Sequence, residues 1–102
     1  MGHTSLVIAI LTTEIFETWF DGLRDAMARK RIASRIHRAE DGNFGDCEAV
    51  GEGVSEMRIH YGPGYRVYFK HQGLEFIILL AGGDKRTQAK DIKAAIDLAR
   101  QL

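Results

Sequence analysis

The stretch Met57–Phe69, with the sequence MRIHYGPGYRVYF, constrains the fold of this chain more than any other. Apolar and polar side chains alternate along it, which is typical of half-buried strands, and the central Gly-Pro-Gly supplies a chain reversal. We predict a β-hairpin that closes symmetrically about Pro63. The cross-strand pairs that follow from this register are Tyr61 with Tyr65, His60 with Arg66, and Arg58 with Tyr68.

Side chains of a strand point alternately to two faces, so the hairpin divides its residues into two sets. The apolar set is expected to face the core and consists of Met57, Ile59, Tyr61, Tyr65, Val67 and Phe69. The polar set is mostly basic and consists of Glu56, Arg58, His60, Arg66, Tyr68 and Lys70. Two planar guanidinium groups held close together suit a phosphate, so the polar face is a candidate phosphate-binding surface.

The polar face has a structural interpretation as well. Arg58 and Arg66 can instead form ion pairs with nearby acids, since buried arginines are usually paired. The acids in question are Glu56 and Asp84. His60 can likewise be an ordinary surface residue.

Periodicity and capping signals divide the rest of the chain into helices and strands. Leu6–Leu11 is a short apolar run and predicts a buried strand, whereas Glu75–Ala81 is apolar on both faces and predicts a central strand. Helices are predicted from Glu14, after a Thr12 or Thr13 cap, to about Leu23, from Arg24 or Asp25 to Glu40, and after Thr87. The acidic, Gly-rich stretch Asn43–Gly53 is expected to be a connection.

The order strand, helix, helix, three strands, helix indicates an α+β domain with an antiparallel sheet packed on helices. With 102 residues, the chain is expected to form a single domain over residues 1–102. We expect the helices to cover one face of the sheet and to leave the Arg58 and Arg66 side partly open. No apolar run approaches the ~20 residues that span a bilayer, and no signal peptide is evident, so we expect a cytoplasmic protein.

Charge is segregated along the chain although the net charge is zero. Arg24–Arg38 contains six Lys or Arg and one acid, whereas Ala39–Met57 contains six acids and no Lys or Arg. Segregation of this kind creates strong local fields. Arg31, Arg35 and Arg38 recur at i, i+4 and i+7 and form a basic ridge on the second helix. The ridge is either a solvated helix face or a contact surface for a phosphate backbone.

The strand Glu75–Ala81 ends in Gly82, Gly83 and Asp84, followed by Lys85. The two glycines are expected to let the backbone turn sharply, so that Lys85 emerges at the end of the strand. No histidine has a partner at metal-ligand spacing, and we predict neither a metal site nor a cofactor.

Four stretches carry a family resemblance: FETWFDGLRD (16–25), GNFGD (42–46), GVSEMRIHYGPGYRVYF (53–69) and LLAGGDKRTQAKDIKAA (79–95). Their most specific combination is E-x-R-I-x-Y-G-x-G-Y-R-V-Y-F followed by G-G-D-K-x-x-Q-x-x-D-I. Together they resemble the RelE/ParE superfamily of toxin–antitoxin toxins, most closely its HigB-like, phage-derived branch of addiction module killer proteins. The resemblance covers nearly the whole chain and implies a RelE-like fold.

The resemblance implies a toxin that stops translation by metal-independent cleavage of mRNA, commonly on the ribosome. In that reaction the ribose 2′-hydroxyl attacks its own phosphate, leaving a 2′,3′-cyclic phosphate or 3′-phosphate and a 5′-hydroxyl. Carried over by motif, the basic residues of the site are Arg58, Arg66 and Lys85.

This chemistry requires a base for the 2′-hydroxyl, an acid for the leaving 5′-oxygen and cations for the charge that develops on phosphorus. The two arginines would bind the phosphate, and Lys85 would assist the leaving oxygen or hold the phosphate. His60 is the candidate acid or base, because histidine ordinarily titrates near neutral pH. Tyr68 and Glu56 are weaker candidates for the base, and Tyr68 could instead stack on a nucleobase. The remaining predicted substrate-binding residues are Lys70, Arg31, Arg35 and Arg38.

The C-terminal sequence AIDLARQL lacks the His or Tyr that ribosome-dependent toxins often carry near this end. The resemblance therefore also leaves open the ParE group, which poisons DNA gyrase without cutting RNA, and a decayed toxin that only binds its antitoxin. The implied partners are mRNA, the ribosome and a helix-turn-helix antitoxin. The resemblance implies that the chain contacts DNA only through the antitoxin complex. The acidic segment 40–56 and the basic helix are both candidate docking surfaces for the antitoxin.

Overall fold

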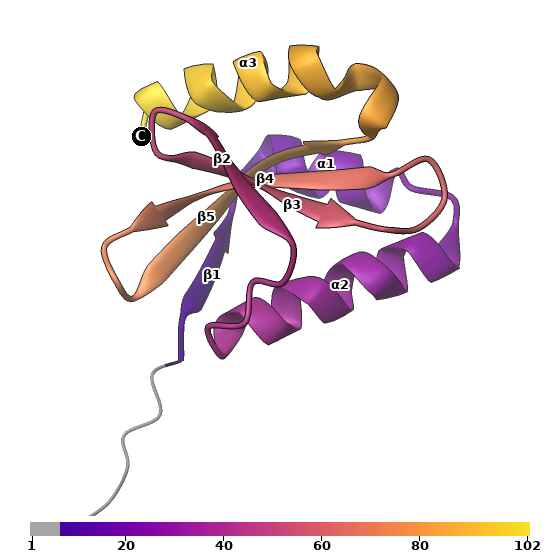
Figure 1. Ribbon diagram of the computed structural model, residues 1–102, viewed down its shortest axis with the longest axis horizontal. Helices are drawn as coiled ribbons and strands as arrows, with labels where there is room; N and C mark the ends of the chain where they lie inside the picture. Colours follow the sequence, from indigo (N-terminus) through magenta and orange to yellow (C-terminus); the bar gives the residue numbers. More distant parts are fainter. Residues whose placement is uncertain (1–6) are drawn as a thin grey trace, which may run out of the picture.

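A five-stranded sheet with the strand order β1-β5-β4-β3-β2 lies at the centre of the molecule (Figure 1). The computed structural model describes residues 7–102. The elements are β1 (Ala9–Thr12), α1 (Glu14–Asp21), α2 (Ala26–Glu40), β2 (Cys47–Gly51), β3 (Val54–Ile59), β4 (Tyr65–Gln72), β5 (Phe76–Gly83), the 3₁₀ helix η1 (Lys85–Thr87) and α3 (Gln88–Arg100). The predicted α+β class is confirmed. The sheet is mixed rather than wholly antiparallel, because β1 runs parallel to β5.

The two edges of the sheet differ from the prediction. The stretch expected to be a connection contains β2, which pairs with β3 and has mostly exposed side chains, so it lacks the apolar alternation that marks a strand. The N-terminal strand is β1, and it is an edge strand rather than a buried one, with Leu11 46% exposed. Leu6, where the predicted strand begins, lies outside the described residues.

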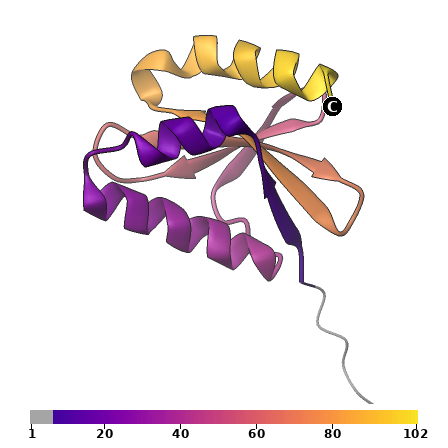
Figure 2. The ribbon, with the colours of Figure 1, turned by 180° about the vertical axis from the view of Figure 1, so that it is seen from behind.

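Helices α1 and α2 begin where the capping signals predict. The Thr13 hydroxyl accepts a hydrogen bond from the Phe16 amide at 3.0 Å, and the Asp25 carboxylate accepts from the amides of Met27 and Ala28. The two helices run in roughly opposite directions over one face of the sheet (Figure 2). The core beneath them contains Phe16, Ile32, Ala39, Met57, Ile59, Val67, Phe69, Ile77 and Leu79.

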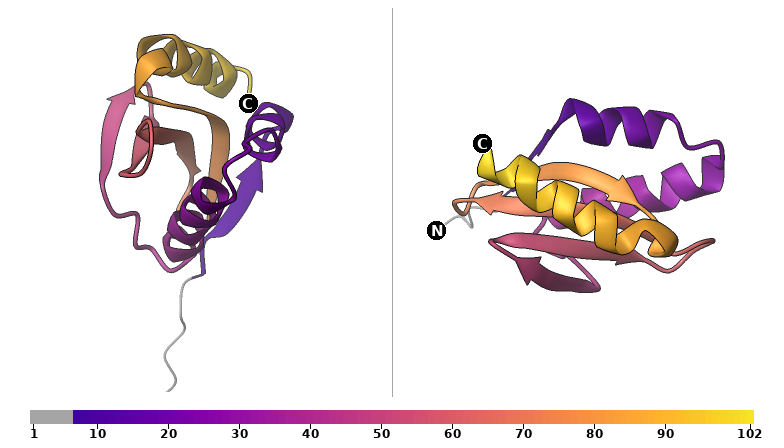
Figure 3. Two further views of the ribbon diagram at one scale, coloured as in Figure 1. Left: turned by 90° about the vertical axis from the view of Figure 1, so that its right-hand side faces the viewer. Right: turned by 90° about the horizontal axis from the view of Figure 1, so that it is seen from above.

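Helix α3 lies on the opposite face of the sheet (Figure 3). Its Ala95 and Ala99 pack in a second core with Val54, Tyr68 and Leu80. The expectation that all helices share one face is therefore wrong. Burial on both sides explains why β5 is apolar in both directions: Leu79 belongs to the first core and Leu80 to the second.

The paired glycines at the end of β5 are required by close approach rather than by a turn. Both lie within the strand, and a Cβ atom on Gly82 would overlap the Trp19 ring of α1. On Gly83 a Cβ atom would overlap the Asp91 carboxylate of α3. Sequence reasoning gave the glycines the wrong role because the helices that contact them come from both faces.

We predict that Gly82→Ala lowers the free energy of unfolding by about 1–3 kcal/mol, as overpacking of a filled site does. Urea unfolding measured by circular dichroism would test this. In a Trp19→Ala background the same substitution should be much less destabilising, because the clashing ring is gone. Equal losses in both backgrounds would contradict the close-approach explanation.

Candidate functional site

The hairpin β3–β4 pairs Arg58 directly with Arg66, which differs by two residues from the predicted register. The reversal is centred on Gly62, where φ is +57°, and a second left-handed glycine follows at Gly64. A shift of two residues keeps every side chain on its predicted face, because side chains alternate with a period of two. The polar set therefore stays together, and the two guanidinium-bearing residues become direct cross-strand neighbours.

A concavity of about 580 Å³, here called the hairpin hollow, lies at the turn end of the hairpin. Its lining consists of Arg58, His60, Tyr61, Gly62, Pro63, Gly64, Arg66 and Lys85. The Lys85 amide donates to the Pro63 carbonyl at 3.4 Å, which ties η1 to the hairpin turn. All four residues predicted as catalytic line this one hollow.

Glu56 is fully buried beneath the hollow and serves as an anchor for its arginines. Its carboxylate accepts hydrogen bonds from Arg58 Nε at 3.1 Å, the Tyr68 hydroxyl at 3.2 Å and Gln88 Nε2 at 2.7 Å. Arg66 Nε lies 3.7 Å from the same carboxylate. Glu56 therefore holds the arginines from below and does not reach the hollow, which leaves it badly placed to act as a base.

The Tyr68 hydroxyl belongs to this buried network as well. Burial first, and then the negative charge of Glu56, raise the pKa of Tyr68 well above its usual range. Tyr68 is completely buried under α3, so its ring is not available to stack on a nucleobase.

Arg58 is surrounded by carboxylates. Besides Glu56, it contacts Glu48 on β2 and lies 3.9 Å from Asp46. The predicted structural pairing of Arg58 and Arg66 with Glu56 is present, whereas Asp84 pairs with Arg86 instead, at 3.1 Å. The positive charge of Arg58 is thus largely compensated within the protein.

Arg66 and Lys85 keep more of their capacity to bind an anion. Within residues 7–102, Lys85 has no carboxylate within 4 Å. Arg66 is 9% exposed, and its buried Nε forms no hydrogen bond in the described part of the chain. Because Arg66 and the exposed Lys85 both line the hollow, their guanidinium and ammonium groups together suit a phosphate oxygen.

His60 follows β3 at the border of the hollow and is exposed, and its Nε2 lies 2.6 Å from the Asp46 carboxylate. The hydrogen bond with His60 is the main cause that lowers the pKa of Asp46, so the carboxylate is ionised at neutral pH. An ionised carboxylate only accepts hydrogen bonds, so Nε2 must carry the hydrogen. The Nδ1 atom is then the ring nitrogen left to exchange a proton.

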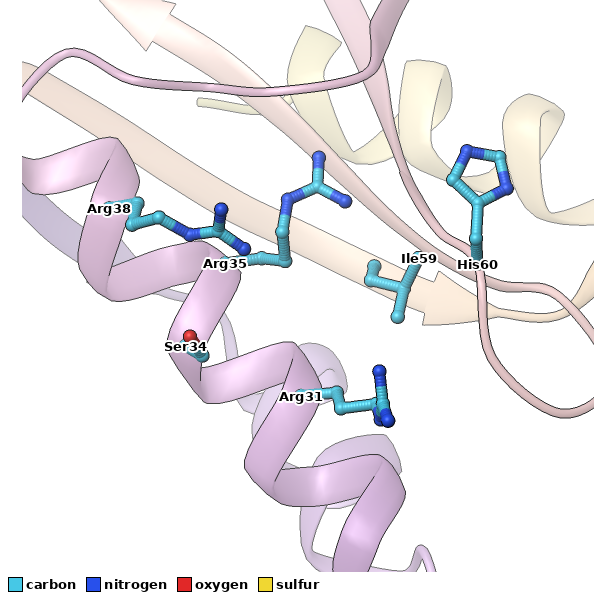
Figure 4. Close-up of a pocket in the computed structure, with 6 residues that line it drawn as sticks. All are labelled: Arg31, Ser34, Arg35, Arg38, Ile59 and His60. Carbon is cyan, nitrogen blue, oxygen red and sulfur yellow. The ribbon is translucent and has the colours of Figure 1, made fainter.

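A second, smaller concavity of about 280 Å³ lies between α2 and the end of β3, and Figure 4 shows its lining. This helix hollow is lined by Arg31, Ser34, Arg35, Arg38, Ile59 and His60. The three predicted ridge arginines therefore meet at one site, which adjoins the hairpin hollow through His60.

The three arginines of the helix hollow have different surroundings. Arg35 donates to the backbone carbonyls of Arg58 and Phe44, the latter at 2.9 Å, and so fastens α2 to the sheet. The Arg31 guanidinium lies 4.9 Å from the centre of the Tyr61 ring. Arg38 is exposed, and within residues 7–102 it has no carboxylate within 4 Å.

Lys70 is the predicted site residue that lies apart from the others. It is four residues beyond Arg66 on β4, which corresponds to roughly 13 Å at ~3.3 Å per residue. It lines neither hollow and lies near Gly53 at the other end of the hairpin.

Three site residues were missed by sequence reasoning: Asp46, Glu48 and Gln88. Asp46 and Glu48 fall at the edge of the unrecognised strand β2, and Gln88 begins a helix that was expected on the other face. The available signals were the Gln of the G-G-D-K-x-x-Q motif and the position of Asp46 at the end of the GNFGD stretch. In residues 7–102, no group of three or more His, Cys, Asp or Glu side chains is arranged to hold a metal ion.

Comparison with known proteins gives a family match over most of the chain. Residues 18–102 match the family described as "Phage derived protein Gp49-like (DUF891)". An uncharacterized protein of Haemophilus influenzae is 48% identical over 97 residues, covering 95% of this chain and 98% of that protein. No solved structure matches the chain. Among residues 7–102, none of the helices has both the length and the apolar character needed to cross a bilayer.

Proposed function

This chain belongs to the family of phage-derived Gp49-like proteins, and on that premise we propose that it is a toxin that cleaves mRNA. The family is associated with toxin–antitoxin addiction modules, which implies an antitoxin partner. Our proposal adds membership of the RelE/ParE superfamily, near its HigB-like branch, and cleavage of transcripts on the ribosome in the cytoplasm. The single observation that supports nuclease activity best is the grouping of Arg66, Lys85 and His60 around one open hollow.

The proposed reaction is a transesterification within the RNA strand. The 2′-hydroxyl gives its proton to His60 Nδ1 while its oxygen forms a bond to the adjacent phosphorus, and the bond from phosphorus to the 5′-oxygen breaks. The Lys85 ammonium gives a proton to the leaving 5′-oxygen, and solvent then returns both residues to their starting states. Arg66 donates to the phosphate oxygens, where negative charge accumulates in the transition state. The products are a 2′,3′-cyclic phosphate and a 5′-hydroxyl.

Asp46 supports this chemistry as a positioning residue. By accepting from Nε2 it fixes the imidazole ring and leaves Nδ1 as the proton acceptor. Asp46 is itself held in place, because its backbone carbonyl accepts from the Arg58 amide at 2.9 Å. Arg58 then has a mainly structural task, since three carboxylates already surround it.

We predict that Asp46→Ala lowers kcat by about 10- to 100-fold, a part of the ~10²–10⁴ that a general base contributes, with little change in KM. The ¹⁵N chemical shifts of His60 should show loss of the single Nε2–H tautomer, while exposed His37 in the same spectrum is unchanged. Glu48→Ala is the matched control, because Glu48, two residues beyond Asp46, also contacts Arg58 but does not contact His60. A His60 tautomer that is insensitive to Asp46→Ala would contradict the assigned role.

The proposed function is tested by inducing the wild-type chain in cells and mapping the 5′ ends of total mRNA, with Arg66→Ala beside it. We expect growth arrest with new in-frame 5′ ends inside translated regions, and loss of both in the variant. Arrest without such ends, accompanied by DNA breaks and an SOS response, would overturn the nuclease and favour a ParE-like gyrase poison. The absence of arrest would favour a decayed toxin that only binds its antitoxin.

The antitoxin of this proposal is a helix-turn-helix DNA-binding protein encoded beside the toxin. The toxin would then contact DNA only through the antitoxin complex. Pull-down of a co-expressed neighbouring gene product, followed by operator binding of the complex, would test this partner.

A further inference from the structure

We propose that the helix hollow is a second phosphate site, so that a single RNA strand lies across His60 and occupies both hollows. The inference rests on the proposed function, because it takes the hairpin hollow as the site of the scissile phosphate. It adds a binding site for a flanking nucleotide, and with it a minimum length of substrate.

The two hollows share one lining residue. His60 lines both of them, with Lys85 and Arg66 on one side and the α2 arginines on the other. Figure 4 shows the Arg35 side chain reaching from the helix toward the side of the hollow where His60 stands, with Arg31 further along α2. A strand whose scissile phosphate lies beside His60 therefore has a direct route from the turn of the hairpin onto α2.

The helix hollow has the charge of an anion site. Its lining contains three arginines and no carboxylate. This contrasts with Arg58 in the hairpin hollow, which three acids surround. Asp46, which bonds to His60, lies near Arg35, but among residues 7–102 Arg31 and Arg38 have no carboxylate within 4 Å. Uncompensated positive charge of this kind attracts the phosphodiester backbone independently of base sequence.

Two of the three arginines of this hollow are also held in place. Arg35 is fixed by backbone carbonyls and forms a rigid wall rather than a free ligand. Arg31 rests on the Tyr61 ring, and the Tyr61 hydroxyl donates to Asp25 at 2.8 Å. The hydrogen bond to Asp25 raises the pKa of Tyr61, which keeps the phenol in its neutral, donating form.

Arg31 and Arg38 are left as the groups that would contact phosphate. They are seven residues apart on α2, which corresponds to about 10 Å along the helix axis. A row of this length follows an extended backbone better than it encloses one compact anion. The ligand class is therefore single-stranded RNA with at least one nucleotide beyond the cleaved bond.

The test measures binding of fluorescently labelled, single-stranded 2′-O-methyl RNA, which cannot be cut because the nucleophilic hydroxyl is blocked. Anisotropy titrations over a series of salt concentrations would compare the wild type with Arg31→Gln, Arg38→Gln and the double variant. Lys30→Gln is the matched control, since Lys30 is an exposed cation on the same helix that lines neither hollow. Two lengths of this RNA serve as probes, an octanucleotide and a dinucleotide.

For the octanucleotide, each lost phosphate contact should reduce the slope of log K against log salt by about 0.7. A dinucleotide bound in the hairpin hollow does not extend to α2, so its affinity should be the same for the wild type and all three Arg→Gln variants. Arg38→Lys retains the charge and should retain the slope, which guards against loss of folding as the cause. Lys30→Gln should leave the slope unchanged with both probes.

Two failures can be told apart. If the wild type binds neither probe, the second site is overturned, whereas cleavage on the ribosome is judged separately by the mapping of 5′ ends in cells. If the wild type binds the octanucleotide but the arginine variants keep its slope, or Lys30→Gln lowers the slope equally, only the second site is overturned.

Discussion

Replacing Lys85 with alanine is expected to lower the rate of RNA cleavage by about 10²- to 10³-fold. In the proposed reaction Lys85 protonates the leaving 5′-oxygen, and a positioned acid or cation of this kind supplies a factor of that size. The substitution should not affect folding, because Lys85 is exposed and, within residues 7–102, no carboxylate lies within 4 Å of it. Single-turnover cleavage of a translated transcript on purified ribosomes would measure the loss.

The matched control for Lys85 is Lys90→Ala, which removes the same charge from the exposed surface of α3, outside both hollows. Its cleavage rate should stay within a few-fold of the wild type. A substrate with a sulfur in place of the leaving 5′-oxygen sharpens the test, since a thiolate leaves without needing a proton. If Lys85→Ala remains slow with this substrate, Lys85 holds the phosphate rather than acting as the acid, and the assigned proton transfer is wrong.

Replacing Glu56 with alanine is expected to lower the free energy of unfolding by about 3–5 kcal/mol. Glu56 is fully buried, and its removal leaves the largely buried Arg66 without its only carboxylate within 4 Å among residues 7–102. Removing one partner of a buried ion pair is strongly destabilising, because the remaining charge is left uncompensated away from water. Urea unfolding followed by intrinsic fluorescence would measure the change.

Glu48→Ala provides the comparison. Glu48 also contacts Arg58, but its side chain is 60% exposed on the edge strand β2. Exposed pairs of this kind contribute about 1 kcal/mol or less. Equal losses for Glu48→Ala and Glu56→Ala would show that burial of Glu56 is not what gives the network its strength.

The hairpin shows which structural features could be predicted from the sequence and which could not. Alternation of side chains identified both strands and both faces, because the period of two is a property of the extended backbone itself. The register was predicted wrongly by two residues, because it depends on the geometry of a turn containing Gly62 and Gly64, both left-handed. The predicted sets survived that error, since a shift of two does not exchange faces.

The site could be predicted only in part, because several of its residues come together through contacts between distant segments. Lys85 and Arg66 were identified as site residues by motif and face. Asp46 was not, since it lies 14 residues from His60 and immediately precedes a strand with no apolar pattern. Glu56 and Tyr68 were expected to face substrate, and both are buried by α3.

By itself, the sequence determined the helices, four of the five strands, the α+β class and the basic character of one hairpin face. These are local properties, set by periodicity, capping and turn-forming residues within short stretches of chain. Only the tertiary structure decided which of the basic residues stay available. Packing of α3 over Glu56 and pairing of β2 with β3 surround Arg58 with acids. Lys85, Arg31 and Arg38, by contrast, have no carboxylate within 4 Å among residues 7–102. Such compensation depends on contacts between distant segments, and no local pattern in the chain encodes it.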